Sequence, residues 1–183
     1  RKSKTEGRVH MGFKIELRKL WSDISAILKN KKQRIWICGH SLGGAMATLC
    51  ASRLEELEPT LYTYGSPRVG GKDWRDGCDV EHYRFVNNND IVTAVPLWLM
   101  GYRHHGIVRY INYYGRIRRL TFWQKVKDSL RGRWKALTKF QMFDGIYDHD
   151  IAGGYADKLQ ALWFESREKI RKRANVGHDR KNV

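Results

Sequence analysis

Apolar residues recur along the first half of the chain with two different spacings, and the spacing changes several times. Between Phe13 and Leu28 they come at steps of three and four, which predicts an amphipathic helix. Residues 35–38 form a short run of β-branched and aromatic side chains, which is typical of a buried strand. The pattern then predicts a helix from Ser41 to about Leu57, a strand ending at Tyr64, a short helix over Lys72–Arg75 and a strand through Tyr83 and Phe85. This alternation indicates an α/β fold with a mostly parallel sheet and flanking helices.

The later part of the chain has a different character. The residues around Gly115 predict a β-hairpin, and Phe122–Phe140 predicts a basic helix whose apolar side chains share one face. A last helix is expected to begin near Ala152. We expect one ordered domain over residues 1–165 and a basic, disordered tail over residues 166–183.

The sequence GHSLG, residues 39–43, places a serine between two glycines where the first strand should meet the second helix. G-x-S-x-G in this context is typical of a nucleophile elbow, a sharp turn that holds the serine away from the backbone. Both glycines are expected to remove side chains that would collide in the turn. The turn also places the N–H of Leu42 at a helix N-terminus, where it can face a developing oxyanion. A glycine-rich turn with an incidental serine is the alternative, and it fits the strand–helix context less well.

A nucleophilic serine such as Ser41 needs a general base, and the base needs an orienting acid. In hydrolases with this elbow, the acid and then the histidine follow the serine in the chain. Asp90 follows an expected strand at its carboxyl end, where open α/β sheets build their sites, although a turn-forming aspartate would occupy the same position. The later histidines are His104, His105, His149 and His178. His149 lies in a late loop and fits the chain order best, but the pattern alone does not exclude the pair at 104–105, whose other role would be structural.

Five segments resemble motifs of the class 3 lipases, the fungal-lipase-like branch of the α/β-hydrolases. VHMGF (9–13) is similar to the family's V-H-x-G-F, GHSLGGAMATL (39–49) to its elbow, YTYGSPRVGG (62–71) to Y-x-x-G-x-P-R-V-G, and FVNNNDIVTAVP (85–96) to N-x-x-D-x-V-x-x-x-P. DHDIAGGY (148–155) resembles more loosely the late loop that holds the family's histidine. The resemblance runs from about Val9 to Leu162 and is weakest between Arg116 and Phe143.

The resemblance implies a triad of Ser41, Asp90 and His149 that cleaves carboxylic esters of lipids through an acyl-enzyme. The family places strands before V-H-x-G-F and takes its second oxyanion donor from a loop there, whereas only eight residues precede Val9 here. We therefore expect a fold without these N-terminal strands and without the second donor. Loss of one donor lowers the rate by about 10²- to 10³-fold. The apolar run Leu97–Met100 is expected to be core, with the lining of an acyl pocket as the alternative.

The net charge of +16 indicates polyanionic partners such as nucleic acid or an anionic membrane. Residues 116–139 hold nine basic residues and one acidic residue, so much of the excess is local. A basic helix with tryptophans suits peripheral contact of residues 116–140 with an anionic membrane, and packing of that helix on the domain is the alternative. A nucleic-acid-binding module is a rival function that rests on charge alone, because no DNA- or RNA-binding motif is visible. A catalytically weak or inactive lipase-like protein that binds lipid is the second rival.

Three cysteines are too few for a disulfide framework. Cys38 and Cys50 lie in an expected strand and helix, which favours buried free thiols and a reducing compartment. Neither a signal peptide nor an apolar run of membrane-spanning length is visible, so we expect a cytoplasmic or peripheral-membrane location. The cysteines and histidines lack metal-ligand spacing, and the expected chemistry requires no metal or organic cofactor.

Overall fold

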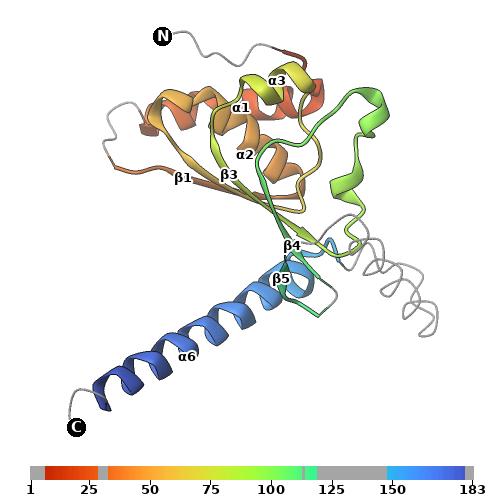
Figure 1. The fold of residues 1–183 in the computed structure, drawn as a ribbon. Coiled ribbons are helices and arrows are strands. Elements are labelled where there is room, and N and C mark those ends of the chain that lie inside the picture. Colours follow the sequence, from red (N-terminus) through yellow and green to blue (C-terminus); the bar gives the residue numbers. More distant parts are fainter. Residues whose placement is uncertain (1–6, 29–32, 113, 119–147, 180–183) are drawn as a thin grey trace, which may run out of the picture.

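A five-stranded sheet forms the centre of the computed structural model, which describes residues 7–28, 33–112, 114–118 and 148–179 (Figure 1). The strands are β1 (Trp36–His40), β2 (Thr60–Tyr64), β3 (Glu81–Asn87), β4 (Ile107–Ile111) and β5 (Ile117–Arg118), and they lie in that order. The first four strands are parallel, and β5 pairs antiparallel with β4. The mostly parallel α/β sheet and the hairpin expected around Gly115 are therefore both present.

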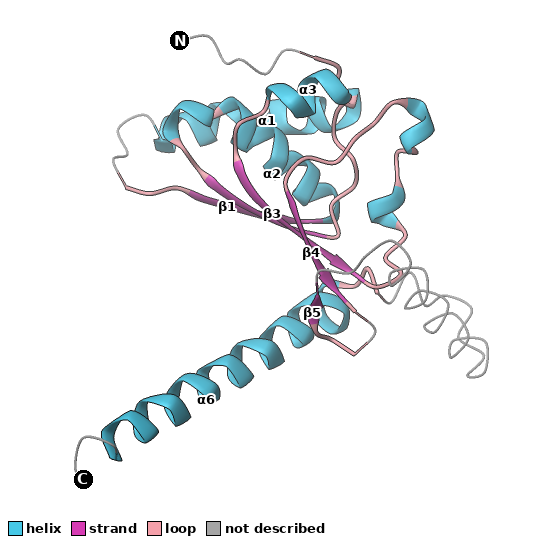
Figure 2. Ribbon diagram, in the orientation of Figure 1, coloured by secondary structure: helices cyan, strands magenta, loops and turns pink. Residues whose placement is uncertain are grey.

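Three helices lie on one face of this sheet: α1 (Met11–Leu28), α2 (Ser41–Arg53) and α3 (Lys72–Gly77) (Figure 2). Small side chains let α2 lie close to the strands, since most of its buried residues are glycine, alanine, serine, threonine or cysteine. α1 packs over α2 through the apolar stripe that its sequence predicts, with Leu17 only 1% exposed. The resulting core also contains Leu61, Val69 and Trp74.

The second helix is shorter than its pattern predicts. α2 ends at Arg53, and Glu55–Leu57 form a separate 3₁₀ turn instead of the last turn of the helix. Proline disfavours helical geometry in the residue before it, and Glu58, which precedes Pro59, adopts a left-handed conformation with φ 47°. The chain therefore leaves the helix early enough to enter β2 at Thr60.

The C-terminal helix is longer than expected. A π-helical turn over Ile151–Ala156 leads into α6 (Asp157–Asp179), which extends away from the sheet (Figure 1). We expected order to end near residue 165, but arginine, lysine, glutamate and alanine predominate beyond it and all favour helix. An ion pair between Lys169 and Glu165 at 2.7 Å, one helical turn apart, stabilises the helix slightly further.

Two expectations of burial were wrong. Cys38 is exposed, because the opposite side of β1 carries Ile37 to the core and β1 is an edge strand of the described sheet; Cys50 is buried, and both thiols are free. The run Leu97–Met100 is not core either, since all four side chains are at least half exposed.

Most of the basic segment 116–140, including the helix expected over Phe122–Phe140, lies outside the described residues. Among the described helices, none is both long and apolar enough to cross a bilayer.

Candidate active site

Ser41 occupies the junction of β1 and α2 and has the strained backbone of a nucleophile elbow. It is the first residue of α2, directly after the last residue of β1, and its φ is 55°. A positive φ is costly for a residue with a side chain and persists only where the surrounding structure enforces it. The expected strand–elbow–helix context is therefore present, and the serine lies at the carboxyl end of the parallel strands.

The two glycines beside the serine have different roles. A Cβ on Gly39 would lie 2.3 Å from the carbonyl oxygen of Gly43, which no side chain can tolerate. A Cβ on Gly43 would meet nothing within 4 Å. Only Gly39 is thus required by the close approach of the turn, and the expectation that both glycines prevent collisions was wrong for Gly43.

Gly39→Ala is expected to lower the free energy of unfolding by about 1–3 kcal/mol, because the elbow must shift to admit the methyl group. Gly43→Ala, its matched control inside a helix, should raise that free energy by up to about 1 kcal/mol. Urea denaturation of both variants measures the difference. Equal stability of the two variants would contradict the close approach at Gly39.

The structure brings Ser41, His149 and Asp90 together in one hydrogen-bonded chain. His149 Nε2 lies 2.8 Å from Ser41 Oγ, and His149 Nδ1 lies 3.0 Å from each carboxylate oxygen of Asp90. The carboxylate is fully buried, whereas the imidazole is 18% exposed. A neutral His149 fits this geometry with Nδ1–H donating to Asp90 and Nε2 accepting from the serine hydroxyl.

Asp90 has two further donors that hold it as a carboxylate facing His149. The backbone N–H of Val92 donates to Oδ1 at 2.9 Å, and the hydroxyl of Tyr155 donates to Oδ2 at 2.5 Å. Tyr155 is 1% exposed, and both its burial and the charge of Asp90 raise the pKa of its phenol. It therefore remains a protonated donor, and its own oxygen accepts the N–H of Asn87 at 3.0 Å.

The loop of His149 is fixed by residues at the ends of β1 and β3, which precede the serine and the aspartate in the chain. His40 Nε2 donates to the backbone carbonyl of His149 at 2.7 Å. Asn87 binds the neighbouring Asp148 through both its carbonyl and its carboxylate, at 2.8 and 3.0 Å, and Lys158 lies 3.4 Å from that carboxylate. These contacts join the histidine loop to the ends of β1 and β3.

Sequence reasoning missed these positioning residues. Tyr155 closes the DHDIAGGY segment and His40 lies inside the elbow motif, but neither position predicts the hydrogen bond that the residue makes. The one available signal was local: a run of three asparagines before Asp90 and an aspartate on each side of His149. Both clusters turn out to anchor the loop, with Asp150 also accepting the N–H of Gly153 at 2.8 Å.

The competing histidines lie elsewhere. His104 Nε2 binds the carbonyl of Thr93 at 2.8 Å, and His105 Nε2 binds the carbonyl of Cys78 at 3.1 Å. Neither has a bond to Ser41, so the structural alternative fits them. His178 lies near the end of α6.

One backbone donor for an oxyanion lies beside the serine, at Leu42. Leu42 is the second residue of α2, where a backbone N–H has no partner inside the helix. The described residues contain no cluster of three or more metal-ligating side chains.

Comparison with known proteins supports one family. Residues 1–100 match the family model described as Lipase (class 3). The secreted mono- and diacylglycerol lipase 1 of Fusarium solani is 34% identical over 110 residues, which make up 52% of this chain and 32% of that protein. Toxin TseL of Vibrio cholerae is 41% identical over 76 residues, 38% of this chain and 12% of the toxin.

Solved structures agree with this result. The Rhizomucor miehei lipase in complex with its propeptide superposes with a TM-score of 0.56 at 31% identity, over 62% of this chain and 41% of that one. The chain thus spans about a third or less of these two curated relatives and under half of the solved lipase. Because the family model covers more than half of the chain, the chain belongs to the class 3 lipase family and has an α/β-hydrolase fold.

Proposed function

We propose that this domain hydrolyses carboxylic esters of lipids through a triad of Ser41, His149 and Asp90. The observation that carries the proposal is the unbroken hydrogen-bond chain from Ser41 Oγ through both ring nitrogens of His149 to the buried Asp90. The names of relatives support the substrate class, since the Fusarium relative is called a mono- and diacylglycerol lipase. A solved triacylglycerol lipase, 30% identical with a TM-score of 0.50, is described as having a serine-protease triad at its catalytic centre.

In the proposed mechanism, His149 Nε2 takes the proton of Ser41 Oγ as the oxygen attacks the ester carbonyl carbon. Asp90 holds the imidazole in the required tautomer and stabilises the imidazolium. The N–H of Leu42 donates to the oxyanion of the tetrahedral intermediate. His149 then gives its proton to the leaving alcohol, and water, deprotonated by the same nitrogen, releases the acid from the acyl-enzyme. The chemistry uses the three side chains, one backbone N–H and water.

Labelling by a fluorophosphonate probe tests the proposal, because the probe reacts with an activated serine and needs no particular acyl group or head group. We expect an adduct on Ser41, identified by peptide mass spectrometry, and its loss in His149→Ala. The matched control is Ser166→Ala, which removes an exposed hydroxyl on α6 and should leave labelling unchanged.

Absence of an adduct on a chain with a cooperative unfolding transition would overturn the proposal for this chain. Under the alternative, a catalytically weak or inactive lipase-like protein, lipid binding would persist without labelling. Retention of the adduct in His149→Ala would contradict the role of His149 as the base but would leave Ser41 as an activated nucleophile.

Two further expectations remain proposals. We infer peripheral contact of residues 116–140 with anionic membranes from the local excess of basic residues. We favour this partner over nucleic acid because no DNA- or RNA-binding motif is visible, and we propose a cytoplasmic or peripheral-membrane location in keeping with it. Salt-dependent binding to anionic vesicles but not to duplex DNA would support both expectations.

A further inference from the structure

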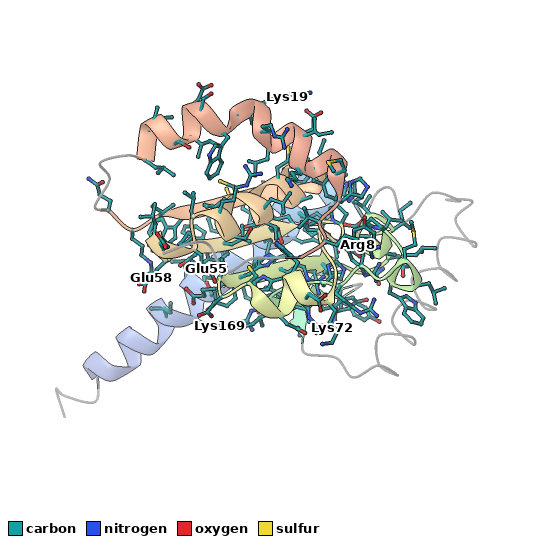
Figure 3. All side chains as sticks on the ribbon, turned by 90° about the horizontal axis from the view of Figure 1, so that it is seen from above. Arg8, Lys19, Glu55, Glu58, Lys72 and Lys169 are labelled. Carbon is teal, nitrogen blue, oxygen red and sulfur yellow. The ribbon has the colours of Figure 1, made fainter. Side chains whose placement is uncertain are left out.

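Arg84 is a cation inside the domain that has no counter-ion among the described residues. It lies on β3, where its Nε–H is closed off from solvent and has no hydrogen-bond partner in the described part of the chain. No carboxylate of these residues forms an ion pair with it. Charged side chains normally lie where water solvates them, as Lys19, Lys72 and Glu58 do at the surface in Figure 3. An unpaired charge that is cut off from water is costly, so a native structure compensates it with a partner, water or an ion.

The strands beside Arg84 offer it no acidic side chain. Its partners in the sheet register are Thr63 on β2 and Val108 on β4, whose side chains lie on the same face of the sheet. Burial and the nearby positive charge of Arg68 lower the pKa of Arg84, which means that its cation is held in unfavourable surroundings. An anion beside Arg84 would relieve both effects.

Other arginines of this region bind carbonyl groups. Arg68 donates to the carbonyl of Pro96 at 3.0 Å, and Arg103 donates to that of Trp98 at 2.7 Å. These bonds hold the backbone of a segment whose side chains face outward. Arg84 differs from both arginines, because its Nε–H has no such acceptor among the described residues.

A small cavity lies beside Arg84, between the sheet and the helices α2 and α3. Its volume, about 10 Å³ for the centre of a water molecule, leaves room for a single small particle. No acidic side chain of the described residues lines it. Its walls include a guanidinium group, two hydroxyl groups and three imidazole rings, from Arg84, Thr48, Ser66, His82, His104 and His105.

Ser66 supplies a second donor at this cavity. Its side chain is buried, and its hydroxyl donates at 3.2 Å to the carbonyl of the adjacent Pro67. That contact is long for a hydroxyl donor, and a hydroxyl hydrogen can rotate toward a better acceptor. A particle in the cavity can therefore accept hydrogen bonds from both Arg84 and Ser66.

We propose that this cavity binds one monatomic anion of the halide class, chloride in ordinary solutions, as the counter-ion of Arg84. A water molecule would satisfy the N–H but would leave the charge uncompensated, and a carboxylate or phosphate has too many atoms for the space. None of Ser41, Asp90 and His149 lines the cavity, so the anion site is separate from the proposed active site.

Urea denaturation in mixtures of sodium chloride and sodium gluconate of equal ionic strength tests the proposal, because gluconate is too large for the cavity. The measurement is made at about pH 7.5, where histidines with ordinary pKa values are neutral. We expect chloride to stabilise the unmodified chain. Above the dissociation constant of the site, each tenfold rise in chloride should lower the equilibrium constant of unfolding by about tenfold.

Two substitutions should remove the chloride dependence in different ways. Arg84→Gln removes the cation. Val108→Glu places a carboxylate on β4 opposite Arg84, where it replaces the anion, so this variant should be as stable in gluconate as in chloride. Val108→Gln is the matched control, because it has nearly the same shape without the charge and should keep the chloride dependence.

Equal stability of the unmodified chain in the two salts would show that the cavity holds water alone, and would overturn the proposal. A chloride dependence that is as large in Arg84→Gln and Val108→Glu as in Val108→Gln would assign the effect to other basic groups, and would overturn it as well. Because the two variants remove the unpaired charge from opposite sides, failure of one to fold leaves the other as a test. The readout is folding and not turnover, so it is independent of the proposed hydrolysis.

Discussion

Ser41→Ala, His149→Ala and the variant carrying both changes are expected to hydrolyse a soluble p-nitrophenyl ester equally slowly. Each should lower kcat by about 10⁴- to 10⁶-fold, because a serine without its base and a base without its serine are both inactive. The hydrogen-bond geometry supports this non-additivity, since one 2.8 Å contact joins the two residues and no second histidine contacts the serine oxygen in the described residues. Asp90→Asn should lower kcat by about 10⁴-fold, because the amide stabilises the wrong tautomer of His149.

The measurement is kcat for the four variants against the unmodified chain, with Ser166→Ala as the control expected to remain fully active. Multiplicative losses, with the double variant slower than either single variant by a further large factor, would show that the two residues act independently. A His149→Ala variant that retains most of its activity would transfer the role of base to another residue. Either result would contradict the triad.

Local patterns explain why the main site residues could be predicted from the sequence. The elbow is encoded by adjacent residues, since a strand, G-x-S-x-G and a helix follow one another without interruption. Asp90 could be assigned because it follows a strand that hydrophobic spacing predicts, whereas the choice of His149 rested on the chain order and on the resemblance to class 3 lipases. Their meeting, across 59 residues of sequence, depends on the sheet order and could only be expected by analogy with the chain order of known hydrolases.

Long-range contacts explain what could not be predicted. The bond of Tyr155 to Asp90 joins residues 65 positions apart, and the bond of His40 to His149 joins residues 109 positions apart. Both residues lie inside segments that resemble family motifs, but a motif does not specify a hydrogen-bond partner so far along the chain. The exposure of Leu97–Met100 was missed for a similar reason, because an apolar run has the same sequence pattern whether arginines elsewhere turn it outward or the core encloses it.

A chain of neutral histidines lies on the helix-covered side of the sheet, where the ring of His105 meets Trp74 of α3. The hydroxyl of Thr63 lies 2.8 Å from His82 Nε2, His82 Nδ1 lies 3.2 Å from His105 Nδ1, and His105 Nε2 lies 3.1 Å from the carbonyl of Cys78. The carbonyl only accepts, so His105 carries its proton on Nε2 and accepts at Nδ1. His82 then donates from Nδ1 and accepts the hydroxyl proton of Thr63 at Nε2. Every hydrogen bond is made with both rings neutral, and a second proton on His105 would place its Nδ1–H against the Nδ1–H of His82.

Burial and positive neighbours oppose protonation of these rings. Burial, together with nearby His105 and Arg84, lowers the pKa of His82 to about 3 from its ordinary 6.5. Burial and the charges of Arg84 and Arg68 lower the pKa of His104 to about 3 as well, despite its bond to the carbonyl of Thr93. Burial also lowers the pKa of His105. Burial, more than the neighbouring charge of Arg68, lowers the pKa of Arg84 to about 10, so its guanidinium remains charged at neutral pH.

Acid is therefore expected to destabilise this domain already above the pH at which its carboxylates titrate. Below about pH 6.5 the unfolded chain binds protons at His82 and His104 that the folded chain does not, so stability falls as pH falls, and this decline ends only near the folded pKa of about 3. For each ring, the free energy of unfolding falls with a slope that approaches about 1.4 kcal/mol per pH unit. By about pH 5 the two rings together lower this free energy by about 4 kcal/mol. That loss is a large fraction of the 5–15 kcal/mol, roughly, that stabilises most domains.

Urea denaturation at several values between about pH 7.5 and 5 measures this slope, in a window above the ordinary pKa values of the carboxylates. His82→Gln and His104→Gln should each flatten the slope by the share of one histidine, and the double variant by two, whatever each substitution does to stability at neutral pH. The slope is the informative quantity, because a substitution that only damages packing lowers stability equally at every pH. A slope that is the same in the unmodified chain and in the double variant would show that these rings do not resist protonation, as would imidazole NMR shifts of His82 or His104 that titrate near their ordinary value in the folded state.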